Sequence, residues 1–97
     1  MVIMTIHFKE HALSEQGLTA ETLLGRFDAY CEKYKISRPQ FNILQKDGEH
    51  GVADISKIIF EIEREIWILD LIETWYWDVD GKREDLLQDA WKWSTRI

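Results

Sequence analysis

The residues of this chain that could carry out chemistry are few and widely spaced. His7 and His11 are four residues apart, a spacing that can place two imidazoles on one helical face for metal binding. His7, however, falls in a stretch that predicts a strand, and the HExxH zinc motif is absent. We therefore predict no metal site and no cofactor.

Nucleophilic chemistry also lacks a motif. Cys31 is the only cysteine, so no internal disulfide can form and a reducing cytosol is the expected compartment. It falls on the apolar stripe of a predicted helix, which indicates a core thiol. No serine lies in a nucleophile elbow, and the sequence has no glycine-rich phosphate loop. We predict that the protein is not an enzyme.

The most unusual stretch is "WDVDGKREDLLQDAWKW" at 77–93, which holds five acids among three tryptophans. Residues 1–48 carry six acids and six bases, whereas residues 49–97 carry twelve acids and six bases, so the second half holds the whole net charge of −6. Such a surface repels nucleic acid and favours a basic partner. A solvated surface that only keeps the protein soluble is the alternative explanation.

The spacing of these acids suggests a mimic of nucleic acid. Asp54, Glu61 and Glu65 fall on one face of a predicted helix, about 5–11 Å apart along its axis. Asp78 and Asp80 in a strand would be about 6.6 Å apart. Proteins that bind DNA use basic channels, and a folded row of carboxylates could occupy such a channel in place of phosphates.

The five tryptophans could form a platform for stacking bases, but such platforms need basic grooves. Because acids are their neighbours, we expect most of the rings to be core, with one or two as interface anchors. Trp93, two residues beyond the core position Trp91, is the expected exposed ring.

Periodicity predicts the elements of the first half. Alternation over 2–9 predicts a strand with one buried face, and the spacing of leucines and aromatics predicts a helix over 19–35 that Thr19 caps. The segment 38–46 fits either a short helix or a strand that enters the Asp47-Gly48 turn.

In the second half, Asp54 is expected to cap an amphipathic helix that reaches at least Glu65. The segment 66–72 is apolar on nearly all sides, so it fits either a buried helix or a strand. Aromatic content predicts a strand over 74–79 that ends at Asp80-Gly81, followed by a helix over 83–95. The apolar run 66–77 is shorter than the roughly 20 residues of a membrane span, so no membrane is expected as partner.

Together these elements predict an α+β fold, a small antiparallel sheet packed against two or three helices, in a single domain over 1–97. The sheet should contain the first strand and the strand over 74–79. The alternative is an all-α bundle in which 55–77 forms one long helix.

The whole chain, from "MTIHFKEHALSEQG" to "DAWKWSTRI", resembles the small phage-encoded anti-CRISPR proteins that act on the type I-F surveillance complex. The resemblance implies a DNA mimic that occupies the duplex-binding cleft near the PAM-reading large subunit and blocks target capture, in the cytoplasm of a bacterial host. These inhibitors share no diagnostic motif, so the candidate contact residues come from the pattern of this sequence. They are Glu61, Glu65, Asp78, Asp80, Glu84, Asp85, Asp89 and Trp93.

Two other functions stay open at the level of sequence. An immunity protein that neutralises a basic nuclease toxin would use the same charge complementarity on another target. An oligomer-forming protein would use the apolar segment 66–77, whereas the inhibitor is expected to be a monomer without direct contact to nucleic acid.

Overall fold

A computed structural model describes the backbone of residues 1–94 and the side chains of residues 1–92. Its strands are β1 (Val2–Phe8), β2 (Ser37–Gln40), β3 (Ile43–Lys46), β4 (Ile72–Val79) and β5 (Lys82–Asp85). Its α-helices are α1 (Glu10–Glu15), α2 (Ala20–Leu24), α3 (Asp28–Lys33), α4 (Gly51–Glu63), α5 (Ile66–Leu69) and α6 (Leu86–Ser94). A 3₁₀ turn at Gly25–Phe27 joins α2 to α3.

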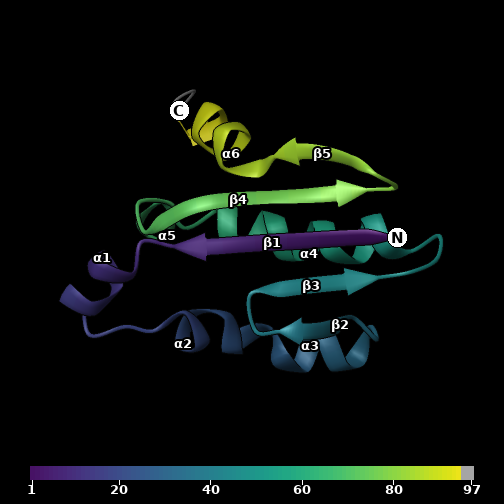
Figure 1. Ribbon diagram of the computed structural model, residues 1–97, viewed down its shortest axis with the longest axis horizontal. Helices are drawn as coiled ribbons and strands as arrows, with labels where there is room; N and C mark the ends of the chain where they lie inside the picture. Colours follow the sequence, from purple (N-terminus) through teal and green to yellow (C-terminus); the bar gives the residue numbers. More distant parts are fainter. Residues whose placement is uncertain (95–97) are drawn as a thin grey trace.

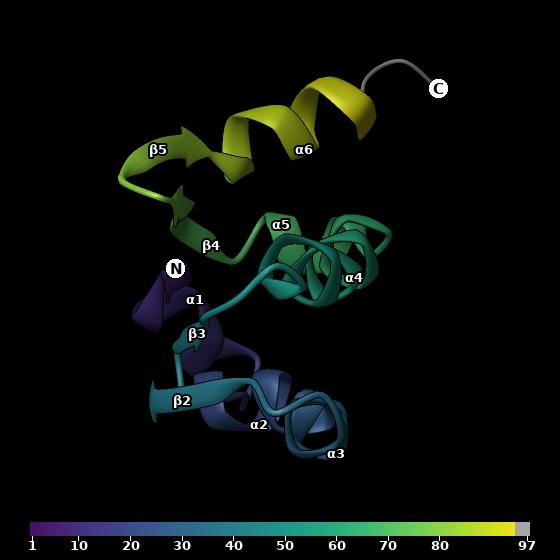
Figure 2. The ribbon, with the colours of Figure 1, turned by 90° about the vertical axis from the view of Figure 1, so that its right-hand side faces the viewer.

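The five strands form one antiparallel sheet in the order β2-β3-β1-β4-β5 (Figure 1). The α+β prediction is confirmed, and β1 and β4 both lie in the sheet as predicted. The all-α alternative is wrong because 72–79 forms a strand next to β1. Figure 2 shows α2 to α6 on the same side of the sheet, while no described helix covers its other face. None of the described helices is both long enough and apolar enough to cross a bilayer.

The core lies between the sheet and this helical layer. On β1, Val2, Met4, Ile6 and Phe8 are buried, which confirms the predicted alternation. Helix α4 covers them with four isoleucines at helical spacing: Ile55, Ile58, Ile59 and Ile62. The helix begins close to the sheet because Gly51 has no side chain. A Cβ atom there would lie 3.1 Å from Cγ2 of Val2 and 3.0 Å from the carbonyl oxygen of Lys46.

Two features of the first half differ from prediction, and the structure decides a third that the sequence left open. The helix over 19–35 is broken after Leu24, where Gly25 starts the 3₁₀ turn, since glycine disfavours the interior of an α-helix. Helix α1 was not predicted because six residues show too little periodicity. The ambiguous segment 38–46 lies in the hairpin of β2 and β3.

The second half also differs at its boundaries. Helix α4 begins at Gly51 and ends at Glu63, so Asp54 lies inside it and Glu65 lies beyond it. The predicted helix over 83–95 begins only at Leu86, because Lys82–Asp85 pairs with β4 as a strand. Asp80 and Gly81 both have positive φ, 50° and 89°, which suits the tight turn of a two-residue hairpin.

Candidate functional site

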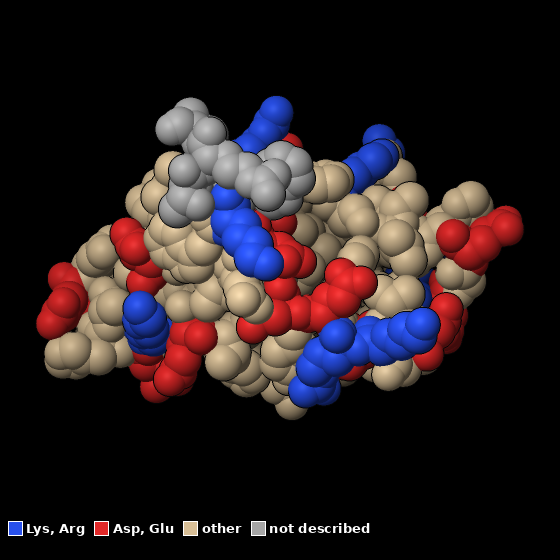
Figure 3. All heavy atoms as spheres, turned by 90° about the horizontal axis from the view of Figure 1, so that it is seen from above, with Lys and Arg blue, Asp and Glu red and all other residues tan. Residues whose placement is uncertain are grey.

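The predicted contact acids lie on two parts of the fold. Five of them follow one another from β4 through the turn and β5 into α6. These five are Asp78, Asp80, Glu84, Asp85 and Asp89. Glu61 and Glu65 lie at the end of α4 and just beyond it. Figure 3 looks onto the edge of the molecule formed by α6 and β5, and it shows acidic side chains at the centre and at both ends of this face, with basic side chains among them. The partners of each acid decide how much of its charge remains available.

Asp78 is neutralised within the β4–β5 hairpin. Asp78 on β4 and Arg83 on β5 lie opposite each other in the sheet, and Arg83 donates two hydrogen bonds to the Asp78 carboxylate, at 3.0 and 3.2 Å. The guanidinium also lies over the ring of Tyr76, 4.1 Å from its centroid. This bidentate and stacked arrangement is geometrically specific, so Arg83 is the natural counterion of Asp78.

Asp80 is paired with the amino terminus. Its carboxylate accepts a hydrogen bond of 2.8 Å from the Met1 amine, and its backbone N–H donates to the Met1 carbonyl at 3.1 Å. The amine lowers the pKa of Asp80, and the carboxylate raises the pKa of the amine. Because Asp80 lies in the turn and not in β4, the predicted strand row of Asp78 and Asp80 is wrong.

The predicted helical row of acids is also wrong. Asp54 is buried, Glu61 is exposed with Arg64 at 3.5 Å, and Glu65 accepts a 2.8 Å hydrogen bond from Arg26. Glu65 has an extended backbone between α4 and α5, which takes it off the helical face. The helical spacing of acids in the sequence continues past Glu63, where the helix α4 ends, so the spacing does not reveal this break.

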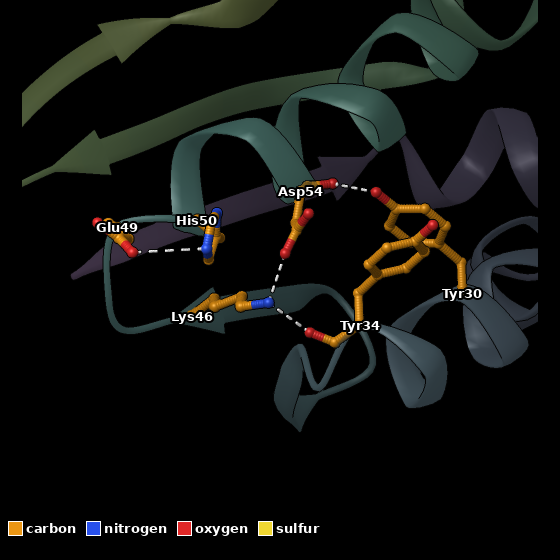
Figure 4. Close-up of polar contacts among 6 residues, drawn as sticks. All are labelled: Tyr30, Tyr34, Lys46, Glu49, His50 and Asp54. Atoms are coloured by element: carbon orange, nitrogen blue, oxygen red, sulfur yellow. Dashed lines mark hydrogen bonds and ion pairs between the residues drawn. The ribbon is translucent and has the colours of Figure 1, made fainter.

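Asp54 belongs to a structural network that Figure 4 shows. Its carboxylate pairs with the ammonium of Lys46, which also donates to the Tyr34 carbonyl at 2.6 Å. The hydroxyl of Tyr30 donates to the Asp54 carbonyl at 2.7 Å. These bonds fasten the start of α4 to β3 and to the end of α3, so the network holds the fold together.

Three of the predicted acids have no counterion in the described chain. Asp85 caps α6 by accepting from the Gln88 N–H at 3.0 Å, and Glu84 accepts from the indole N–H of Trp77 at 3.4 Å. Asp89 is exposed and lies near Glu63 of α4, whose pKa is raised by burial and then by the charge of Asp89. We call Glu63, Glu84, Asp85 and Asp89 the acidic edge. Among residues 1–92, no lysine or arginine forms an ion pair with any of them.

The tryptophans are less buried than expected, since only one of the four described side chains is fully in the core. Trp75 is fully buried, and Trp77 and Trp91 are half-buried. The side chain of Trp93 lies outside the described residues, so its predicted exposure stays a prediction. Trp67, which was not singled out, is 50 % exposed. The sequence contains a sign of this exposure, the four consecutive apolar residues of Ile66–Leu69, because a helix of four residues cannot bury side chains that point to all of its sides.

An open cleft of about 400 Å³ lies at the other end of the sheet, between β1, α1 and the start of α2. Its polar lining residues are His7, Glu10, Ser14, Thr19, Glu21 and Asn42. Thr19 caps α2, and Asn42 donates to the Ile6 carbonyl at 3.1 Å. No hydrogen bond in the described structure joins His7 to Ser14 or to a carboxylate, so the cleft lacks the paired groups of an acid–base site.

No three His, Cys, Asp or Glu side chains in the described part of the chain gather closely enough to hold a metal ion. Cys31 is buried, as predicted, and burial raises the pKa of its thiol. Comparisons with protein-family models, with curated proteins and with solved structures find no match for this chain.

Proposed function

We propose that this protein is an inhibitor that occupies a basic, DNA-binding cleft on another protein and thereby excludes DNA. The acidic edge is the observation that carries the proposal, because its four carboxylates have no counterion within residues 1–92. The resemblance to anti-CRISPR proteins makes the type I-F surveillance complex the first partner to test, with target capture near its PAM-reading subunit as the step that is blocked.

The mechanism is competition and requires no catalysis. Lysine and arginine side chains that hold DNA phosphates would instead hold carboxylates of the acidic edge. The net charge of −6 steers the protein toward such a cleft and raises the association rate at low salt. The same charge disfavours direct contact with nucleic acid, and a monomer in the host cytoplasm suffices for this action.

Repulsion between the carboxylates of Glu63 and Asp89 gives the acidic edge a preference for cations. Glu63 is half-buried on α4, and Asp89 of α6 raises its pKa further. A basic group placed between the two would offset the repulsion, so binding gains more there than at an acid that already has a partner. The acids Asp78, Asp80, Glu61 and Glu65 have internal partners and are secondary contributors in this proposal.

The proposal is tested by competition between this protein and target duplex for the purified surveillance complex. The test variant neutralises Glu84→Gln, Asp85→Asn and Asp89→Asn together, and Asn at position 85 keeps the helix cap. We expect several-fold weaker binding or more, a shallower dependence on salt, and a nearly unchanged melting temperature.

A matched control carries the same change in charge elsewhere. Glu10→Gln, Glu21→Gln and Glu32→Gln are exposed positions without an ion pair in the described chain. Equal binding by the two triple variants would refute the acidic edge as the contact surface. If the wild type binds a single basic nuclease and not the surveillance complex, the immunity function replaces the proposed one.

A further inference from the structure

Exposed apolar side chains are concentrated on the outer side of the helical layer. Six large hydrophobic residues are exposed in the described structure, and four of them lie on α4 and α5. These four are Val52, Phe60, Ile66 and Trp67. Phe60 is the most exposed at 61 %, and Trp67 is 50 % exposed.

The helical geometry explains why they face solvent. Val52 and Phe60 are eight residues apart on α4, on the side away from the buried isoleucines that pack on the sheet. Helix α5 has only four residues and directs Ile68 and Leu69 into the core, which leaves Ile66 and Trp67 outside. Phe60, Ile66 and Trp67, which we call the apolar patch, come from eight consecutive positions of the chain.

The apolar patch lies in acidic surroundings. Residues 57–70 include four acids and two bases. Arg64 lies 3.5 Å from Glu61, and Arg26 pairs with Glu65. The ammonium of Lys57 lies over the Tyr34 ring, 5.4 Å from its centroid. Glu63 and Asp70 are therefore the acids of this segment without an ion pair among the described residues. Glu63, part of the acidic edge, lies between Phe60 and Ile66 in the chain. Residues three apart on a helix are neighbours on its surface, so the patch adjoins the acidic edge where Phe60 and Glu63 lie on α4.

These charges identify the kind of partner. Two copies joined through the apolar patch would each bring a net charge of −6 to the interface, and like charges across an interface are unfavourable. A basic protein surface has the complementary charge. Aromatic and aliphatic anchors that become desolvated carry most of the energy of an interface, whereas exposed ion pairs contribute little.

We propose that Phe60, Ile66 and Trp67 anchor this protein on an apolar area within the cationic surface of its partner. The inference rests on the proposed function, because it adds the anchor of the same complex, and it assigns separate tasks to the two surfaces. The acidic edge sets the association rate and its dependence on salt, and the apolar patch sets the dissociation rate.

The experiment compares binding rates to the purified type I-F surveillance complex at two salt concentrations. Phe60→Ser with Trp67→Ser removes the patch at two positions that are at least half exposed, so the fold is expected to persist by circular dichroism. We expect dissociation about tenfold faster or more, with the association rate and its salt dependence unchanged. Phe41→Ser, at a position 44 % exposed on the β2–β3 turn, is the control and should bind as the wild type does.

The outcomes separate the two proposals. A wild-type dissociation rate for the patch variant, together with weak binding by the acidic-edge variant, overturns the anchor and leaves the inhibitor proposal standing. Failure of the wild type to bind the complex overturns both. Sedimentation of the wild type and of the patch variant gives a further check. If the wild type is a dimer and the patch substitutions dissociate it, a second copy covers the patch. That result would overturn the inference of a basic partner.

Discussion

The ion pair between Lys46 and Asp54 shows that an acidic residue can stabilise the fold instead of belonging to the exposed acidic surface. The Lys46 and Asp54 side chains are 18 % and 12 % exposed. The Lys46 ammonium also donates to the Tyr34 carbonyl, and the Tyr30 hydroxyl donates to the backbone carbonyl of Asp54. Sequence reasoning placed Asp54 with the surface acids, because its spacing from Glu61 fits a helical face. Its partner Lys46 lies on a strand that the sequence left ambiguous, so the pair could not be predicted.

Replacing Asp54 should therefore be costly. Asp54→Ala leaves the Lys46 ammonium without its counterion in a site of low solvent access, and we expect a loss of about 2–4 kcal/mol in the free energy of unfolding. Urea denaturation measures this loss. The double variant Lys46→Met with Asp54→Leu should recover most of it, because apolar residues of similar volume replace such a pair at little cost. A loss below about 1 kcal/mol in the single variant would contradict the structural role.

At the scale of elements, strong periodicity was informative and short charged segments were not. The alternation on β1 and the aromatic content of β4 predicted two strands of one sheet, and the structure shows that they are neighbours. Strand β5, by contrast, has the sequence KRED with every residue exposed, so it has no apolar period. It forms because the Asp80-Gly81 turn leads it back along β4, where backbone hydrogen bonds hold it.

The start of α6 offers a test of this boundary. Asp85 ends β5 and accepts from the Gln88 N–H at 3.0 Å, so it acts as the cap of a helix that begins at Leu86. We expect Asp85→Ala to lower the unfolding free energy by about 1 kcal/mol and Asp85→Asn to leave it nearly unchanged, since Asn caps as well as Asp. Thermal melts followed by circular dichroism distinguish the two variants. Equal losses would show that the charge, and not the cap, matters at this position.

For the whole molecule, periodicity predicted an α+β fold and the charge count predicted an anionic second half, but neither predicted which acids remain available. For Glu65 and Asp80 the reason is that the counterion is distant in sequence. Arg26 pairs with Glu65, 39 residues away, and the Met1 amine pairs with Asp80, 79 residues away. Such pairs depend on the order of strands and on helix packing, which no local pattern contains. The acidic edge is what remains after these pairs form.

Glu63 should make the stability of the whole molecule depend on pH. Burial and the charge of Asp89 raise the pKa of Glu63 above its usual value of 4.5, so the folded state binds the proton more tightly than the unfolded state. Stability is therefore reduced at neutral pH, rises as pH falls through the folded pKa, and gains nothing more from this group below 4.5.

Glu63→Gln removes the charge without changing the shape of the side chain. At pH 7 we expect a gain of about 0.5 kcal/mol after solvent screening, which corresponds to about 2–4 °C in melting temperature for a domain of this size. Below pH 4.5 the variant and the wild type should melt together, because Glu63 is then protonated in both states. Glu61→Gln is the control: its exposed carboxylate faces Arg64, so neutralising it should give no gain. A lower melting temperature for Glu63→Gln at pH 7 would show that Glu63 is satisfied within the fold, and the acidic edge would lose its reason to prefer a cationic partner.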